Sequence, residues 1–214
     1  MAHSTSAQQF DRHAKDYDQW FDKNPDVFKA EVNAILSLAP PFENSLEIGV
    51  GSGRFAAALG IRHGIDPAPQ MLSLARARGI DATIGEAEHL PFTDERYDSA
   101  FMITSLCFMR NQLNAMKEAH RVLKANGILV IAFIPKNSQL GIKYRKDRSK
   151  DSLYRLADFF SYSELLKKLK TTGFSIQNSS QTLLNPNLSL DVLPGHARGS
   201  FVVVSARKLT CSRA

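Results

Sequence analysis

The sequence predicts an α/β fold that forms one domain. Apolar, strand-like runs alternate with helical segments between about residues 45 and 134, an arrangement typical of helices packed on a parallel sheet. The stretch 46–55, LEIGVGSGRF, indicates a strand that runs through a glycine-rich turn into a helix. A chain of 214 residues is long enough to bury about 70 % of the surface that its unfolded form exposes. We find no internal repeat and no second domain in this sequence.

The N-terminal forty residues predict two helices that follow a short disordered end. Residues 1–9 are mostly small and polar, so we expect them to be disordered. The apolar side chains that follow recur at helical spacing: Phe10, Ala14, Tyr17 and Phe21, with Trp20 beside them. This stripe can pack the helix against the body. A second helix is expected to begin with Asn24 as its cap and Pro25 in its first turn, and to stop at the prolines at positions 40 and 41.

The other elements follow from apolar runs, stop signals and one capping motif. We expect strands at 61–65, 81–84, 97–103, 128–134, 174–183 and 200–207, and helices at 69–78, 111–123 and 161–173. Ser161 and Glu164 form the S-x-x-E pattern of a capping box, which places the start of the last helix. Residues 136–160 lack a clear period and are interpreted as an insertion or cover.

Composition favours a protein of a reducing compartment, with the cytoplasm as the expected location. The chain has two cysteines, Cys107 and Cys211, no signal sequence and no apolar run near 18 residues. We therefore expect no stable membrane insertion.

Charge is distributed unevenly along the chain. Residues 1–135 carry 13 basic and 16 acidic side chains, whereas residues 136–214 carry 14 and 5. The densest basic run, residues 143–150, is either a solvated loop or a patch for an anionic substrate, a nucleic acid or an anionic membrane surface. Tyr144 and Tyr154 flank it, but two aromatic side chains are too few to indicate a stacking platform.

The glycine-rich turn predicts a site for a nucleotide-like ligand. Gly49, Gly51 and Gly53 can adopt positive φ and let a ligand lie against main-chain amides, next to the positive end of a helix. The spacing is G-x-G-x-G, and Arg54 stands where the G-x-G-x-x-G pattern of dinucleotide sites has its last glycine. Glu47, just before the turn, suits a ligand that carries an ammonium group. These features favour S-adenosylmethionine (SAM) over a dinucleotide, although such a turn can also be only a tight loop.

Two acidic positions follow at the ends of later strands. Asp66, in the phrase GIDPAPQML, can accept both hydroxyls of a ribose. The acidic turn Glu86-Ala87-Glu88 can contact the edge of an adenine ring through a carboxylate and a main-chain amide.

Four motifs in this order resemble the class I SAM-dependent methyltransferases: EIGVGSG at 47–53, DPAPQML at 66–72, GEAEHLPF at 85–92 and RVLKANGILV at 121–130. The nearest resemblance is to the small-molecule branch that includes the ubiquinone and menaquinone biosynthesis enzymes. It implies a single domain over residues 1–214 with a Rossmann-like, doubly wound sheet of seven strands, the last one antiparallel, and helices on both faces. It also implies a helical lid over residues 10–40 and SAM across the strand ends. The short interval from Gly53 to Asp66 departs from the pattern and predicts a first crossover helix of only two turns.

The resemblance assigns the methionine part of SAM to Glu47 and the glycines, the ribose to Asp66, and the adenine to Glu86 with Ala87. It also implies that Tyr17 and Trp20 close over the ligands. The full set of expected cofactor-binding residues is Tyr17, Glu47, Gly49, Gly51, Gly53, Asp66, Pro67, Met71, Glu86, Ala87, Glu88 and Thr104. S-adenosylhomocysteine (SAH) would be the product.

No catalytic residue can be assigned from the sequence. Methyl transfer from a sulfonium depends mainly on alignment of the reactants, and a base helps only some acceptor atoms. His13, His89 and Cys107 are possible bases, but they are better explained as a surface residue, a loop residue and a small buried side chain. No Cys or His spacing indicates a metal site.

The expected acceptor is a small organic molecule. Methyltransferases that act on amino groups of nucleic acids carry Asp or Asn, two prolines and an aromatic residue after the fourth strand, whereas residues 104–108 here are TSLCF. Two alternatives stay open: an NAD-dependent oxidoreductase, and a SAM-binding or RNA-associated protein without catalysis that uses the basic C-terminal third. The acceptor atom and the oligomeric state are not indicated.

Overall fold

The computed structural model describes residues 5–38, 43–147, 153–185 and 187–210. Within these ranges the strands form one mixed sheet of eight strands in the order β3-β2-β1-β4-β5-β8-β6-β7. Their bounds are β1 Ser45–Ile48, β2 His63–Asp66, β3 Asp81–Ile84, β4 Tyr97–Ile103, β5 Leu123–Phe133, β6 Phe174–Leu184, β7 Leu193–Pro194 and β8 Gly199–Lys208. The first five strands pair in parallel, and β8 lies antiparallel between β5 and β6.

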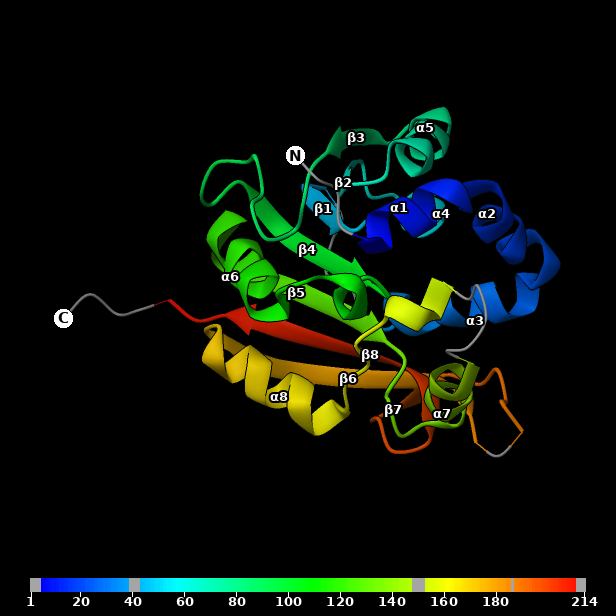
Figure 1. Ribbon diagram of the computed structural model, residues 1–214. Coiled ribbons are helices and arrows are strands. Elements are labelled where there is room, and N and C mark those ends of the chain that lie inside the picture. The colour runs from blue at the N-terminus through cyan, green and yellow to red at the C-terminus, as the bar shows by residue number, and fades with distance from the viewer. Residues whose placement is uncertain (1–4, 39–42, 148–152, 186, 211–214) are drawn as a thin grey trace.

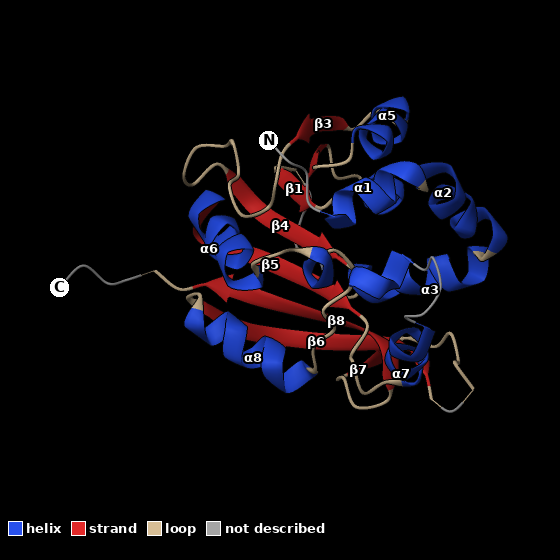
Figure 2. Ribbon diagram, in the orientation of Figure 1, coloured by secondary structure: helices blue, strands red, loops and turns tan. Residues whose placement is uncertain are grey.

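Helices cover both faces of the sheet (Figures 1 and 2). Their bounds are α1 Thr5–Arg12, α2 Ala14–Lys23, α3 Pro25–Leu36, α4 Arg54–Leu59, α5 Pro69–Ala77, α6 Gln112–Val122, α7 Gln139–Lys146 and α8 Tyr162–Thr171. The short helical turns η1 Leu106–Phe108 and η3 Leu153–Leu156 lie between them. Apolar side chains of α6 and α8 pack on one face, and those of α3, α4 and α5 pack on the other. The expected α/β class with helices on both faces is confirmed.

The sheet differs from the expected seven strands by the two-residue strand β7. Its residues pair only with Ser180 and Gln181 of β6. The segment is too short to show a period, and Pro194 lacks the amide that a longer ladder would need. The seven longer strands include the antiparallel β8, as expected.

The N-terminus departs from the expectation at three places. Helix α1 already begins at Thr5, so residues 5–9 are helical rather than disordered; residues 1–4 lie outside the described residues. Ala7 is buried, and the Ser6 hydroxyl donates to the Phe108 carbonyl at 3.2 Å. No local sequence pattern predicts these contacts. The stripe expected on one helix is divided between α1 and α2 at His13.

The start of α3 is also only partly as expected. Pro25 occupies the first turn, but the Asn24 side chain does not cap the helix, because its Nδ2 donates to the Trp20 carbonyl at 2.8 Å. The helix ends at Leu36, and the prolines at positions 40 and 41 lie outside the described residues.

Local signals placed the later elements well. In α8, Ser161 accepts from the Glu164 amide and the Glu164 side chain accepts from the Ser161 amide, so the capping box is confirmed. Helix α4 has 6 residues, as the short interval before Asp66 predicted. The stretch read as an insertion contains α7, which Ser138 caps by accepting from the Gly141 amide at 3.1 Å. In the described part of the chain, no helix combines the length and hydropathy that crossing a bilayer requires.

Candidate active site

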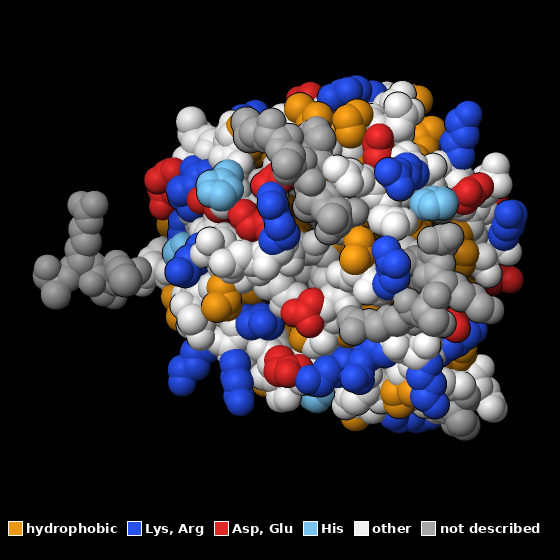
Figure 3. Space-filling view, viewed as in Figure 1, with side chains coloured by type: hydrophobic (Ala, Val, Ile, Leu, Met, Phe, Trp, Pro, Cys, Tyr) orange, Lys and Arg blue, Asp and Glu red, His pale blue; other side chains and the backbone are white. Residues whose placement is uncertain are grey.

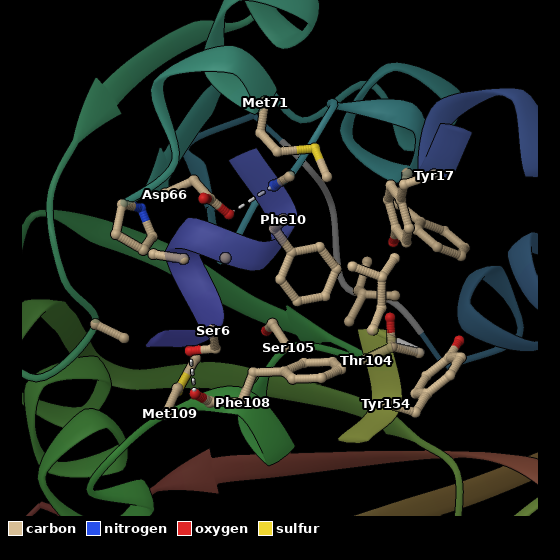
Figure 4. Close-up of a pocket in the computed structure, with 18 of the residues that line it drawn as sticks. Ser6, Phe10, Tyr17, Asp66, Met71, Thr104, Ser105, Phe108, Met109 and Tyr154 are labelled. Carbon is tan, nitrogen blue, oxygen red and sulfur yellow. Dashed lines mark hydrogen bonds between the residues drawn. The ribbon is translucent and has the colours of Figure 1, made fainter. Parts of the chain in front are cut away.

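A cavity of about 470 Å³ lies at the carboxyl ends of the parallel strands (Figure 4). The turn after β1, the end of β2 and the end of β4 form its floor, and α1 and α2 cover it. The volume is typical of sites for small ligands, and the position is the usual one for ligands of open α/β sheets.

The glycine turn brings bare backbone to the wall of this cavity. Gly51 has a φ of 52°, and a Cβ built there would meet only Tyr17, at 3.9 Å. A Cβ on Gly49 would instead collide with Ser105, and one on Gly53 would lie 2.9 Å from the Ala75 backbone. Gly49 and Gly51 therefore line the cavity, whereas Gly53 allows α5 to pack closely and lies outside the cavity wall.

Asp66 anchors the turn and points into the cavity. Its Oδ2 accepts from the Gly51 amide at 2.9 Å and its Oδ1 from the Ala68 amide at 2.9 Å. Burial raises the pKa of this carboxyl to about 6, although the two amides oppose the change. A carboxylate has about four acceptor positions, so lone pairs remain for two hydroxyls of a ligand.

Glu47 lies behind the turn and not on the cavity wall. Its side chain is 2 % exposed, and its Oε2 has no partner among the described residues. Burial and then the nearby Asp66 raise the pKa of Glu47 well above its usual range. The structure therefore does not bring this carboxyl to the surface on which a ligand would lie.

The acidic turn lines the cavity, but its carboxylates already have partners. Both carboxylate oxygens of Glu86 accept from the Arg110 guanidinium, at 2.6 and 2.7 Å. The Glu88 Oε1 accepts from the Asn111 amide at 3.0 Å. Ala87 lies between them on the cavity wall, together with Pro67 and Met71 of the β2–α5 connection.

Aromatic side chains of α1 and α2 cover the cavity from above (Figure 4). The Phe10 ring meets Phe108 edge-on at 4.8 Å and Tyr17 at 5.6 Å, measured between ring centroids. Tyr17 and Thr104 both line the cavity, and burial raises the pKa of the Tyr17 hydroxyl, which keeps it protonated. Thr104, at the end of β4, has a φ of 50°, which is strained for a residue of this type.

Three comparisons with known proteins agree with this geometry. Residues 46–131 match the family model described as "Methyltransferase domain". An uncharacterised protein of Methanocaldococcus jannaschii is 38 % identical over 203 residues, which are 94 % of this chain and 98 % of that protein. A crystal structure from Thermotoga maritima, described as a SAM-dependent methyltransferase and possible histamine N-methyltransferase, superposes with a TM-score of 0.90 at 36 % identity. The match covers 95 % of this chain and 99 % of that one.

The chain belongs to the SAM-dependent methyltransferases. A further relative is the demethylmenaquinone methyltransferase of T. maritima, which is 30 % identical over 144 residues, 61 % of this chain and 62 % of that protein. The resemblance to class I methyltransferases drawn from the motifs is thus confirmed.

An ion-pair cluster joins helix α2 of the methyltransferase to the body. Arg54 Nε donates to Asp18 at 2.9 Å and Arg54 Nη2 to Asp22 at 2.7 Å, while Arg78 Nη2 donates to Asp18 at 2.7 Å. Asp18 is 13 % exposed; desolvation acts to raise its pKa, but the hydrogen bonds from Arg54 and Arg78 outweigh it and lower the pKa to about 2. The sequence showed Arg54 only as a departure from the dinucleotide pattern; its partners lie 32 and 36 residues away.

The cavity of the methyltransferase has a second half that the motifs did not indicate. We call it the acceptor half and define it by Glu31 of α3, Leu140 and Tyr144 of α7, Tyr154 of η3, and Leu183 of β6. The rings of Tyr144 and Tyr154 stack with centroids 4.1 Å apart and planes 8° from parallel. One signal for Glu31 was available: it is an acid one helical turn from Phe28 and Ile35 of the apolar stripe.

The possible bases named from the sequence are poorly placed. Burial raises the pKa of the Cys107 thiol to about 12, which leaves it without the thiolate that nucleophilic chemistry needs. His13 reaches the cavity wall from the break between α1 and α2, and its side chain is 38 % exposed. Among the described lining residues His89 does not occur. Over the described ranges, no three His, Cys, Asp or Glu side chains converge to hold a metal ion.

Proposed function

We propose that this enzyme transfers the methyl group of SAM to a small organic acceptor bound in the acceptor half of the cavity. One observation carries the proposal: a single cavity joins the Gly51–Asp66 corner to a second, mainly apolar and aromatic half. Bound SAM would supply a methyl group on a cationic sulfur, and the C–S bond would break with its electron pair left on sulfur as the acceptor lone pair bonds to carbon. Holding two reactants in line can supply about 7–11 kcal/mol of the barrier.

The residues at the strand ends fit this cofactor. The lone pairs that Asp66 has left suit ribose hydroxyls, and the backbone at Gly51, which carries no side chain, leaves room for the methionine part. The main chain at Ala87, rather than the paired carboxylates of Glu86 and Glu88, is the better placed group for an adenine edge. A direct contact of Glu47 with the ligand stays a prediction, since this residue lies behind the turn.

The remaining cofactor assignments are proposals of the same kind. Pro67 and Met71 would form an apolar wall beside the adenosine, and Tyr17 with Thr104 would close the boundary between the two halves of the cavity. Gly53 would act only through the packing of α5.

The related proteins support a small acceptor. Histamine and demethylmenaquinone, which two of their descriptions name, are both small organic molecules. A dinucleotide is not favoured, because the side chain at the position of the third glycine is Arg54, which Asp18 and Asp22 bind. The cytoplasmic location stays a prediction.

Calorimetry with SAH tests the cofactor assignment. We expect Asp66→Ala to weaken SAH binding by about 1.5–3 kcal/mol, the range for hydrogen bonds to a charged group. Asp98→Ala is the control, because Asp98 is exposed and pairs with Lys124 outside the cavity. Unchanged SAH affinity in Asp66→Ala would contradict the assignment.

Two further measurements test the reaction. If NAD raises the unfolding temperature of the protein and SAH does not, the oxidoreductase would be favoured instead. Incubation with labelled SAM and a metabolite extract, followed by mass spectrometry, should give products that are heavier by one methyl group.

A further inference from the structure

Glu31 is a buried carboxyl group in the acceptor half that the cofactor assignment does not use. It lies on α3, which packs against β6 and β8, on the opposite side of the cavity from Asp66 at the end of β2. Its side chain is 7 % exposed. Within the described chain, Glu31 forms no hydrogen bond or ion pair, and burial alone raises its pKa to about 8.

The surroundings of Glu31 would suit a cation. The titratable side chains that face it are Tyr17 of α2, Tyr144 of α7 and Tyr154 of η3. Burial raises the pKa of all three hydroxyls, so they stay neutral. A carboxylate without a partner is costly to bury, and aromatic faces attract cations.

The basic side chains of the cavity are either already paired with an acid or lie at its edge. Of the described lining residues, Arg110 is the one Lys or Arg, and it is bound to Glu86 at the adenine turn. His13 approaches from the break before α2. An anionic acceptor would thus find no counter-charge beside Glu31, whereas an ammonium group would find a carboxyl group whose ionised form it can pair with.

We propose that the acceptor is an amine with an apolar or aromatic body, and that Glu31 binds its nitrogen and removes its proton. This inference rests on the proposed function and names its substrate class. An N–H bond of the ammonium breaks, its electron pair stays on nitrogen as a lone pair, and the proton bonds to a carboxylate oxygen of Glu31. The amine becomes neutral and nucleophilic, and Glu31 becomes a neutral acid.

The geometry also gives the other acceptor-half residues a role. The stacked Tyr144 and Tyr154 would offer a flat surface to the body of the amine, and Leu140 with Leu183 would cover its apolar part. Tyr17 and Thr104 lie where the two halves meet.

Calorimetry on the SAH complex provides the test. The probes are phenethylamine, its neutral counterpart phenethyl alcohol and its anionic counterpart hydrocinnamate, with the matching set of straight-chain alkyl compounds. In the unaltered enzyme we expect an amine to bind more tightly than its alcohol and its acid. Glu31→Gln should reduce amine affinity about tenfold or more, the effect of losing one charge-assisted hydrogen bond, and leave SAH affinity unchanged.

Two variants serve as controls for folding and for charge. Asp26→Asn removes a carboxylate from an exposed position of the same helix and should change neither affinity. Glu31→Asp keeps the carboxylate and should retain the preference for amine over alcohol, though with lower affinity.

The outcomes separate the two proposals. If no amine is preferred over its alcohol and acid, or if Glu31→Gln keeps that preference, the inference is wrong although SAH binding stands. If SAH does not bind the unaltered enzyme, the proposed function itself is wrong.

Discussion

Burial controls the protonation of three carboxyl groups in and behind the cavity. It raises the pKa of Asp66 to about 6 and that of Glu31 to about 8, and it raises the pKa of Glu47 well above its usual range. Each folded-state pKa exceeds that of the unfolded chain, so the folded protein holds protons that the unfolded chain releases. The free energy of unfolding therefore decreases as pH rises from the unfolded pKa to the folded one.

Glu31→Gln should stabilise the ligand-free enzyme, and more so in alkali. At about pH 9 the unaltered carboxyl is ionised and buried, whereas at about pH 5 it holds its proton in the folded state. We expect the variant to raise the unfolding temperature by on the order of 5 °C at the higher pH and by clearly less at the lower pH. Thermal unfolding at both pH values, with Asp26→Asn alongside, measures the difference; equal shifts would show that Glu31 ionises normally.

Single residues of the site were predictable only where the chain signals them locally. Gly51 and Asp66 follow directly after short apolar runs, so their place at the strand ends could be inferred. Glu31, Tyr144 and Tyr154 reach the cavity through α3, α7 and η3, whose packing on the sheet depends on contacts far away in the sequence. The ion pair between Glu86 and Arg110 joins residues that are 24 positions apart, so it could not be predicted from the sequence either.

At the scale of elements, α2 is joined to α4 and α5 by charge. Arg54 begins α4, Arg78 caps α5, and both bind Asp18 of α2. The Arg54 guanidinium also lies 5.8 Å from the centre of the Phe21 ring. These contacts are partly buried and form a network, so they should contribute more than isolated surface pairs.

Arg54→Ala should loosen the lid and weaken cofactor binding. We expect faster hydrogen exchange of the α2 amides and about a tenfold loss of SAH affinity. Fewer molecules would have α2 in the closed position before binding, so part of the binding free energy would be spent on closing it. Lys124→Ala is the matched control, since it breaks an exposed pair with Asp98. Unchanged exchange in α2 together with unchanged SAH affinity would show that the cluster does not hold the lid.

Elements with strong local signals were the ones that the sequence predicted well. Strands β3 and β4 match their expected bounds, and the capping box fixed the start of α8. Helix α1, the break at His13 and the strand β7 were missed, because tertiary contacts rather than local patterns determine them.

At the scale of the whole molecule, basic side chains lie on several sides of the surface, including its lower side over α7 and α8 (Figure 3). Helix α7 also contributes Leu140 and Tyr144 to the cavity wall. Lys143, Arg145 and Lys146 end α7, and residues 148–150 of the basic run lie outside the described residues.

We expect the binding of RNA to be weak and independent of the cofactor. Dissociation constants should be about 10⁻⁴ to 10⁻⁶ M and rise steeply with salt, as for contacts with phosphates alone. Charge reversal at Lys167 and Lys168 on α8 should weaken this binding and leave SAH affinity unchanged. Tight RNA binding that survives about 0.2 M salt would support the RNA-associated alternative.

The roof formed by α1 and α2 has a consequence for repeated catalysis. Both products would lie beneath Phe10 and Tyr17, so their release should be easier once the roof lifts and the Arg54–Asp18 and Arg78–Asp18 contacts part. Dissolved ions screen the exposed Arg54–Asp22 pair more than the two contacts of the largely buried Asp18. If opening of the roof limits turnover, the first turnover of each enzyme molecule should be faster than the later ones. Higher ionic strength should then increase the steady-state rate.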